Sequence, residues 1–246
     1  MTDQLRGKVA IVTGSSRGIG KAIALGFARE GARIVVCGRS TGEGELTIET
    51  TASAIEALGG EAIAVPCDVT AEADVEALVA AAIDRWGRID VLVNNAGAKW
   101  GRGLDETSFA NWRELFSTNV DGVFLCTVAV LPHMRLQESG SIITISSMRS
   151  QSDDAGAIGY AASKAAADRF MIKLAADVRG AGIAANVLYP GSTATEQSMA
   201  RADAAPGRQT AEEKKIIPAC IYLATQTAQG ITGQLLDQED FQVTWP

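Results

Sequence analysis

Residues 8–20 read KVAIVTGSSRGIG, and this stretch decides the fold. Its first six residues, Lys8 to Thr13, form a short apolar run that is typical of a strand buried on both faces. Three glycines then punctuate a small polar loop, and the helical pattern 21–31 follows. This order suits a phosphate group, because glycines let the backbone approach it and a helix N-terminus offers free N–H groups. The spacing is G-x-x-x-G-x-G, and the plain alternative is an ordinary strand-to-helix turn.

The alternation of strand and helix continues along the chain. Because such strands form right-handed βαβ units, we predict an α/β protein with a Rossmann-type, doubly wound parallel sheet of about seven strands flanked by helices. No linker-like change of composition interrupts residues 1–246, so we predict a single domain. The predicted strands are 8–13, 33–38, 62–66, 90–93, 142–145, 182–189 and 233–237. The predicted helices are 21–31, 43–58, 71–86, 109–134, 157–180 and 211–224.

Composition narrows the class of protein. Of the 246 residues 47% are hydrophobic, which is enough for a large core. The net charge is −7 and there is no basic run, so we expect no nucleic-acid partner. No apolar run reaches the roughly 18 residues of a membrane span, and the start of the chain lacks the apolar segment of a signal peptide. We therefore expect no membrane partner. The four cysteines are widely spaced and there is a single histidine, so we expect no metal site. Reduced thiols fit a cytoplasmic location, which we expect for this protein.

A second polar stretch follows a strand end and enters a helix. Ser147 comes two residues after the predicted strand 142–145, and Tyr160 and Lys164 are four residues apart near a helix start. Side chains at i and i+4 share a helix face, so the phenol and the ammonium can point into one space. A nearby ammonium favours the phenolate and lowers the tyrosine pKa from its usual value of about 10. These groups suit proton transfer to or from an oxygen, whereas the plain alternative is a solvated lysine beside a half-buried tyrosine.

The second predicted strand ends at residues 38–40, where this type of sheet meets an adenosine ribose. No acidic residue lies between positions 36 and 41 to accept from a 2′-hydroxyl. Arg39 is there instead, and Arg17 lies in the first loop, so two guanidinium groups could hold a 2′-phosphate. We therefore expect NADP(H) rather than NAD(H), the alternative being two solvated arginines. Asp68, at the third strand end, could bond an adenine amino group or simply cap the next helix.

Together these residues resemble the classical short-chain dehydrogenase/reductase family over nearly the whole chain. The resemblance rests on Thr13-Gly14-x-x-x-Gly18-x-Gly20, Asn94-Asn95-Ala96-Gly97, Asn119, Ser147, Tyr160-x-x-x-Lys164 and Pro190-Gly191. Ser147 is preferred to Ser146 because it lies thirteen residues before Tyr160, the usual offset in that family.

The resemblance implies a nicotinamide-dependent oxidoreductase that acts on a small carbonyl or alcohol substrate. Tyr160 would be the general acid in reduction and the base in oxidation, and Ser147 would orient the substrate oxygen. Lys164 would lower the pKa of Tyr160 and bond the nicotinamide ribose. Asn119 would hold a water that links Lys164 to solvent, in a helix that Asn119 and Gly122 would kink. The implied cofactor-binding residues are Gly14, Ser16, Arg17, Gly18, Ile19, Gly20, Arg39, Asp68, Val69, Asn95, Ala96, Gly97, Tyr160, Lys164, Pro190, Gly191, Thr193 and Thr195.

Two features depart from the family pattern. The last strand runs into Asp237-Gln238-Glu239-Asp240, where family members often have Asp-Gly-Gly, which puts the C-terminal geometry in question. The loop 149–154 is unusually polar, and we hypothesise that its charges pair with polar groups of the substrate, the alternative being that they face water. A substrate loop is expected at about 192–212. Residues expected to border the substrate are Lys99, Trp100 and Met199.

The substrate stays open at this point. A 3-oxoacyl group on acyl carrier protein is one candidate, but that carrier is acidic and the helix after Lys164 is only thinly basic. A steroid, a sugar or a cyclic diketone is equally compatible. A different class, a non-catalytic NADP-binding sensor or scaffold, would be marked by loss of the tyrosine or lysine, and both are present. The family often forms tetramers through its two long helices, so a homo-oligomer, a tetramer or a dimer, is expected.

Overall fold

The computed structural model describes residues 3–42, 44–101, 103–191 and 215–246. Its seven strands are β1 (Val9–Thr13), β2 (Arg33–Gly38), β3 (Glu61–Pro66), β4 (Val91–Asn94), β5 (Gly140–Ile145), β6 (Ile183–Tyr189) and β7 (Leu235–Asp237). They pair in parallel in the order β3-β2-β1-β4-β5-β6-β7. The crossover from β3 past β1 to β4 is the mark of a doubly wound sheet, so the predicted fold is confirmed.

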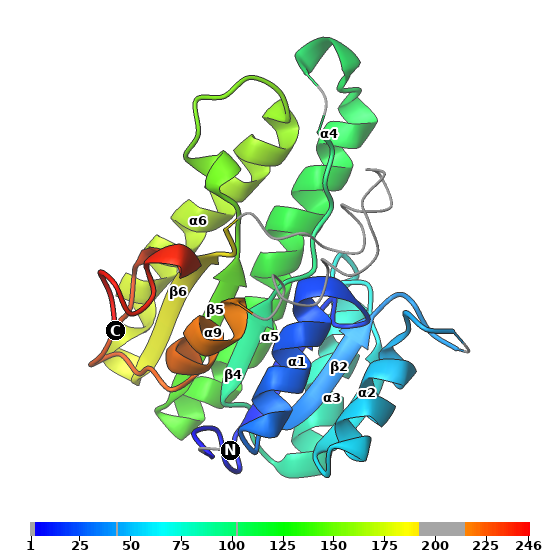
Figure 1. The fold of residues 1–246 in the computed structure, drawn as a ribbon, viewed down its shortest axis with the longest axis vertical. Helices are drawn as coiled ribbons and strands as arrows, with labels where there is room; N and C mark the ends of the chain where they lie inside the picture. Colours follow the sequence, from blue (N-terminus) through cyan, green and yellow to red (C-terminus); the bar gives the residue numbers. More distant parts are fainter. Residues whose placement is uncertain (1–2, 43, 102, 192–214) are drawn as a thin grey trace.

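Helices cover both faces of this sheet (Figure 1). The α-helices are α1 (Gly18–Arg29), α2 (Ile48–Ala57), α3 (Glu72–Trp86), α4 (Phe109–Phe116), α5 (Gly122–Gln137), α6 (Ile158–Val178) and α9 (Ile216–Ala224). Short helical turns are η1 (Leu104–Glu106), η2 (Ser117–Asp121), η3 (Met148–Ser150), η4 (Arg179–Ala181) and η5 (Gln238–Asp240). Helices α1 and α9 lie side by side on the near face in Figure 1.

Two hydrophobic cores explain why the strands read as unbroken apolar runs. Ala10 and Val12 of β1 face a core built with α1, α2 and α9, whereas Ile11 between them faces a second core built with α3, α5 and α6. All five β1 residues are buried. A strand covered by helices on both sides cannot alternate apolar and polar residues, so the continuous run predicted this arrangement.

Several predicted boundaries differ from those in the structure. The second helix begins at Ile48 rather than at 43, because Thr47 caps it: its side chain accepts a hydrogen bond from the Thr50 N–H at 3.2 Å. The last strand is shorter than expected and begins at Leu235. The predicted helix 211–224 is described only from Ile216, because 211–214 lie outside the described residues.

The predicted long helix 109–134 is interrupted rather than simply kinked. A π-helical turn, η2, separates α4 from α5 at the position where the sequence places Asn119 and Gly122. By length and composition alone, residues 109–137 could cross a membrane, because an 18-residue window within them has a mean hydropathy of 1.5. In the structure, however, Cys126, Val130 and Met134 of α5 are buried in the second core, as expected for a core helix of a globular domain.

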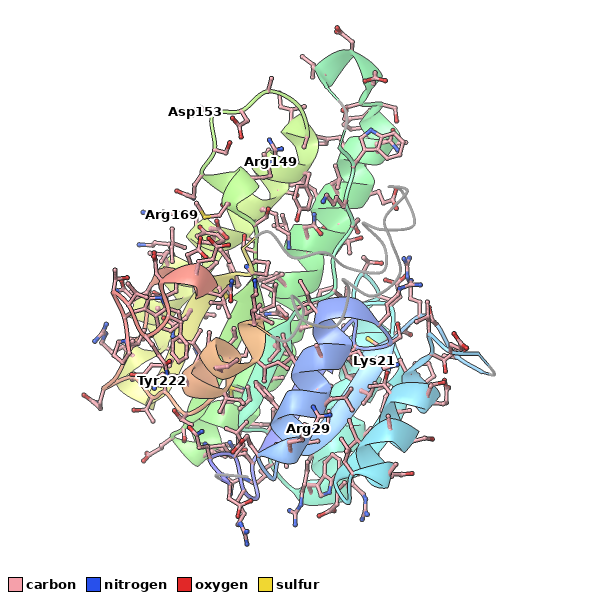
Figure 2. The ribbon with its side chains drawn as sticks, in the orientation of Figure 1. Lys21, Arg29, Arg149, Asp153, Arg169 and Tyr222 are labelled. Carbon is pink, nitrogen blue, oxygen red and sulfur yellow. The ribbon has the colours of Figure 1, made fainter. Side chains whose placement is uncertain are left out.

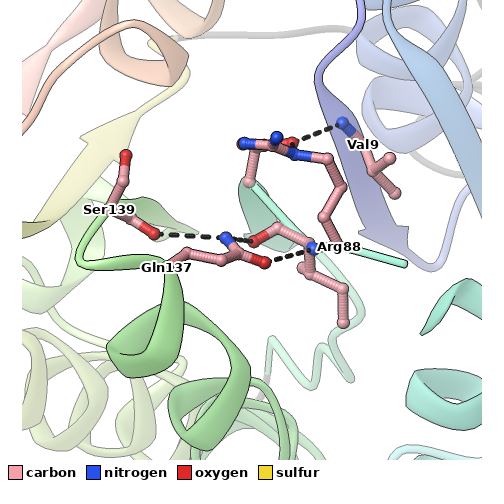
Figure 3. Close-up of polar contacts among 6 residues, drawn as sticks. Val9, Arg88, Gln137 and Ser139 are labelled. Carbon is pink, nitrogen blue, oxygen red and sulfur yellow. Dashed lines mark hydrogen bonds and ion pairs between the residues drawn. The ribbon is translucent and has the colours of Figure 1, made fainter. Parts of the chain in front are cut away.

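Polar contacts at the amino ends of the strands tie the lower edge of the sheet together (Figure 3). The buried Asp90 carboxylate accepts hydrogen bonds from the Val9 N–H at 2.9 Å and from two Arg88 nitrogens at 2.6 and 2.9 Å. Gln137 bonds both the N–H and the carbonyl of Ile89, at 3.0 and 2.8 Å. This edge is therefore closed by the protein's own groups, and the opposite edge, at the carboxyl ends of the strands, is where a ligand can enter.

Candidate active site

A cavity of about 360 Å³ lies at the carboxyl ends of the strands. Segments that follow β1, β2, β3, β4, β5 and β6 all contribute to its wall, together with the start of α6. The structure brings together most of the residues that the sequence singled out. Those that line the cavity are Gly14, Ser16, Arg17, Gly18, Ile19, Arg39, Asp68, Val69, Asn95, Ala96, Gly97, Ser147, Tyr160, Lys164, Pro190 and Gly191.

The glycine loop is shaped for a close approach of backbone to ligand. Gly14 has a left-handed φ of 64°, and a side chain there would place its Cβ 2.9 Å from the Cα of Ala96. Helix α1 then begins without any side-chain cap and without an acidic residue in its first turn. Its first N–H groups and its positive dipole end are thus available to an anion, as a diphosphate requires. Gly20 does not line the cavity but lies behind the loop, where a side chain would collide with Asn95 and the Gly14 carbonyl.

Thr13 and Asn95 fix this loop to the end of β4. The Thr13 hydroxyl accepts hydrogen bonds from the N–H groups of Asn95 and Ala96, both at 3.0 Å. The Asn95 side-chain amide donates to the carbonyls of Thr13 and Gly14 at 2.9 and 3.1 Å. Asn95 also lines the cavity, so besides holding the loop it remains a predicted cofactor contact. The sequence analysis named Thr13 only as part of the glycine motif and predicted no role for its hydroxyl, although its place at the strand end was a usable signal.

The adenosine end of the cavity carries a cation and an anion close together. Arg39 forms an ion pair with Asp68 at 3.7 Å, and the Arg39 side chain is 77% exposed. The other Asp68 oxygen accepts from the N–H and the hydroxyl of Thr70, and these bonds, with a smaller contribution from Arg39, lower the pKa of the Asp68 carboxyl. Asp68 does not cap the next helix, because the N-cap residue of α3 is Ala71. Arg17 lines the same cavity.

The proton-transfer candidates meet where η3 and α6 approach each other. The backbone turns sharply just before α6, with left-handed φ values of 87° at Gly156 and 50° at Ala157, so the helix starts two residues before Tyr160. Burial raises the pKa of the Tyr160 phenol, and a hydrogen bond with the Ser147 hydroxyl partly offsets this. The expected lowering of this pKa by Lys164 is therefore not found, and the net direction in this protein without cofactor is upward.

Lys164 is a buried ammonium held by a backbone carbonyl. Its Nζ donates to the Ile145 carbonyl oxygen at 2.9 Å and lies 6.0 Å from the centre of the Tyr160 ring. Burial lowers the pKa of Lys164 to about 8, and the negative charge of Asp168 acts in the opposite direction. The upward shift of the Tyr160 pKa is due to burial, with a smaller contribution from the negative charge of Asp168.

Asn119 is fully buried and does not line the cavity. Its Oδ1 accepts from the Ala98 N–H at 2.8 Å, and its Nδ2 donates to the Ala98 carbonyl and to the Ser163 hydroxyl, both at 2.9 Å. The side chain thus joins the loop after β4 to α6. A Cβ placed on Gly97 would be 3.2 Å from Asn119 Oδ1 and 3.7 Å from Lys164 Nζ, so both groups flank the same backbone segment.

The charged residues of the polar loop before α6 do not line the cavity. Arg149 and Asp153 lie on a projecting segment in Figure 2. Arg149 pairs with Asp154 at 3.5 Å, their side chains are 47% and 76% exposed, and none of these three residues lines the cavity. The interpretation that these charges face water fits better than the substrate-pairing hypothesis. Lys99 does line the cavity, whereas Trp100 does not, and its indole N–H is buried without an acceptor among the described residues.

Several predicted residues cannot be placed. Thr193, Thr195, Met199 and the whole of the proposed substrate loop 192–212 lie outside the described residues. Cavity residues that the sequence did not single out sit beside predicted ones, at the same strand ends or at the π-turn η2. They are Gly38, Ser40, Cys67, Ala98, Thr118, Ile145 and Ser146.

The divergent C-terminal residues 237–245 fold back on themselves next to the carboxyl end of β6. Asp237 holds η5 by accepting from the Glu239 N–H at 2.9 Å, and Trp245 donates from its indole to the Asp237 carbonyl at 2.9 Å. A side chain on Gly191 would meet the Glu239 carboxylate at 2.7 Å. The acidic sequence that replaces the two glycines therefore packs against the segment that follows β6.

Comparison with known proteins agrees with this geometry. A family described as short chain dehydrogenase matches residues 8–205. A 3-oxoacyl-[acyl-carrier-protein] reductase of Synechocystis sp. is 38% identical over 79% of this chain and 77% of its own length. A 7alpha-hydroxysteroid dehydrogenase of Escherichia coli is 34% identical over 96% of this chain and 94% of its own. The crystal structure of a short-chain type dehydrogenase/reductase from Mycobacterium marinum superposes with a TM-score of 0.85, at 29% identity, over 96% of this chain and 95% of that one.

Proposed function

Because this chain belongs to the short chain dehydrogenase family, whose members are nicotinamide-dependent oxidoreductases, we propose that it uses NADP(H) to interconvert a carbonyl compound and a secondary alcohol, with Tyr160 as the acid/base. One observation carries the proposal. Tyr160 and Ser147 both line the wall of a cavity whose other end is an uncapped glycine loop. Proton-transfer groups and a diphosphate site thus share one cavity.

The chain's own residues account for everything except the hydride, which the bound cofactor supplies. In reduction, negative charge builds on the carbonyl oxygen, and the Tyr160 hydroxyl donates a proton to it. In this proposal Ser147 donates a hydrogen bond to the same oxygen. The Lys164 ammonium places a positive charge beside Tyr160, which favours the phenolate that remains. In oxidation the phenolate takes the proton back.

Preference for NADP(H) is supported by the charges at the adenosine end. Arg17 and Arg39 line the cavity there, and the end of β2 carries no carboxylate that would repel a 2′-phosphate. Asp68 is the one acidic residue among the described lining residues, and Arg39 already neutralises it. A cytoplasmic site of action suits an enzyme with this cofactor.

Substrate identity is best approached from the two relatives. One is named for a 3-oxoacyl thioester and the other for a hydroxysteroid, so the panel should contain both chemistries beside simple ketones, diketones and keto-esters. NADPH oxidation is followed by absorbance, with NADH in parallel. Tyr160→Phe is expected to lower kcat by about 10²–10⁴-fold while NADPH binding persists. Tyr222→Phe on α9, where the tyrosine packs on Phe241 and Trp245 (Figure 2), is the matched control and should behave as wild type.

The outcomes separate the two classes of function. Turnover that is lost in Tyr160→Phe and kept in Tyr222→Phe supports the proposal. Tight NADPH binding without turnover of any carbonyl would instead favour a non-catalytic NADP-binding sensor or scaffold.

The protein is also proposed to be a homo-oligomer that associates through α5 and α6. Phe124 and Val128 leave about half of their surface exposed on α5, and Phe124 meets Phe170 of α6 edge to face at 6.1 Å. Exposed aromatic and aliphatic side chains that gather across two helices are typical of a subunit contact.

A further inference from the structure

Asp168 is a buried carboxylate on the helix that carries two of the proposed catalytic residues. It follows Lys164 by four residues and Tyr160 by eight, so the three side chains share one face of α6. Its Oδ2 accepts hydrogen bonds from the Ser150 hydroxyl at 2.6 Å and from the Tyr189 hydroxyl at 2.9 Å. Its Oδ1 is buried too, with no donor among the described residues. A buried carboxylate with one oxygen unpaired is costly, so its presence calls for an explanation.

Its two donors come from the two chain segments that border the proposed reaction centre. Ser150 ends η3, the turn whose N-cap residue is Ser147. Tyr189 ends β6 and leads directly into Pro190 and Gly191, which line the cavity. One carboxylate on α6 therefore holds both neighbouring segments by hydrogen bonds.

We propose that Asp168 is a positioning residue for the reaction: it fixes the Ser147 turn and the end of β6 against the helix face that carries Tyr160 and Lys164. The inference rests on the proposed function, because it gives Asp168 a part in that reaction.

The negative charge of Asp168 has a second consequence for Lys164. The titratable groups that it influences are Tyr160 and Lys164 on its own helix and Tyr189 from β6, with the Ser150 hydroxyl as its partner from η3. Within the described part of the chain, Asp168 takes part in no ion pair at 4.0 Å or less. Its charge opposes the effect of burial on Lys164, and so favours the protonated lysine next to Tyr160. An uncharged residue of similar shape in place of Asp168 would fill the same space but would not favour the protonated form of Lys164.

The test compares Asp168→Asn, which removes the charge at constant size, with Asp168→Glu, which keeps the charge. Asp177→Asn, the same change at an exposed position of α6, is the matched control. Two quantities are measured on the full chain. The first is kcat and KM with NADPH and the best carbonyl of the panel. The second is the pH dependence of acetylation of Lys164 by acetic anhydride, read by mass spectrometry, which reports its protonation without any substrate.

Asp168→Asn is expected to lower kcat tenfold or more, with KM for NADPH within about twofold of wild type, and to move the acetylation midpoint of Lys164 to lower pH. Asp168→Glu should restore part of kcat and move the acetylation midpoint part of the way back. Asp177→Asn should change neither kcat nor the midpoint. Wild-type kcat together with an unshifted midpoint in Asp168→Asn would overturn the inference. If the wild type reduces no carbonyl, the proposed function fails, but the acetylation midpoint still decides the influence of Asp168 on Lys164.

A second pair of variants guards against a failure of Asp168→Asn to fold. Ser150→Ala and Tyr189→Phe each remove one hydrogen bond to Asp168 and leave its charge in place. Both are expected to lower kcat more than KM. Wild-type kcat in both would overturn the positioning role.

Discussion

The Lys164 ammonium donates a hydrogen bond of 2.9 Å to the carbonyl oxygen of Ile145, the last residue of β5. Ser147 follows Ile145 by two residues, so this bond joins the helix of Tyr160 to the strand end that carries Ser147. The lysine accomplishes this as a buried charge. Burial of this charge therefore lowers the free energy of unfolding, by an amount that depends on pH.

Lys164→Met is predicted to stabilise the protein at neutral pH. Burial lowers the pKa of Lys164 from 10.5 to about 8 in the native state. Below pH 8 the lysine is protonated in both the native and the unfolded state, so the full free-energy cost of burying its charge is present. Between pH 8 and 10.5 the native state has released the proton that the unfolded chain still holds, so the cost disappears as pH rises. Burying the charge costs about 3 kcal/mol. Loss of the hydrogen bond from the charged ammonium offsets about 1.5–3 kcal/mol of this, so the expected net gain at neutral pH is at most about 2 kcal/mol.

Thermal unfolding across pH 6–10.5 checks this prediction. The Lys164→Met variant should melt above wild type at pH 7, and the gap should close towards pH 10.5. A gap that is constant across this range, or a lower melting temperature at pH 7, would show that the lysine is not a buried charge in solution. Activity should be lost in the same variant, which is the usual cost of a stabilised active site.

Arg39→Ala is predicted to weaken NADPH binding by about 10–100-fold, the effect expected from losing a hydrogen bond to a charged group. Binding of NADH should change little, because in the proposed role the guanidinium pairs with a 2′-phosphate, which NADH lacks. Fluorescence titration with both cofactors measures the difference. Arg29→Ala, an exposed arginine at the far end of α1 (Figure 2), is the control. Equal weakening of both cofactors would contradict the 2′-phosphate role.

The sheet and the glycine loop could be predicted from sequence because each depends on a local pattern. A continuous apolar run from Val9 to Thr13, followed at once by Gly14, leaves little choice of structure. The grouping of Ser147 with Tyr160 was predictable for a related reason. Parallel strands end at one edge of the sheet, so motifs at strand ends are brought together by topology.

Features that depend on tertiary contacts could not be predicted. Asp168 reads as an ordinary polar residue of an amphipathic helix, and only the fold brings Ser150 and Tyr189 to it. The pKa of Tyr160 was expected to fall because spacing shows a neighbouring lysine but not the burial of both groups. The π-turn at Asn119 was seen only as a possible kink, since its hydrogen bonds to Ala98 and Ser163 are long-range.

Asp90→Asn is predicted to destabilise the fold without affecting the site. The carboxylate accepts from the Val9 N–H and from Arg88, and hydrogen bonds to a charged group contribute about 1.5–3 kcal/mol. For a chain of this size the melting temperature should fall by about 3–10 °C. Asp84→Asn, exposed on α3, is the matched control. NADPH affinity measured below the transition should equal that of wild type, because Asp90 lies at the opposite edge of the sheet; weaker binding would contradict this separation.

Phe124→Glu is predicted to shift the protein towards smaller species. Phe124 is 49% exposed on α5 and packs edge to face on Phe170 of α6, so in a subunit contact across these helices it would be central. A carboxylate there would have to be desolvated on association, which costs far more than the lost aromatic contact. Sedimentation velocity of wild type and variant measures the change. Leu136→Glu is the control, because Leu136 is 86% exposed near the end of the same helix and charge there should leave the mass unchanged. Wild-type mass for Phe124→Glu at low micromolar concentration, or a monomeric wild type, would remove α5 and α6 as the subunit contact.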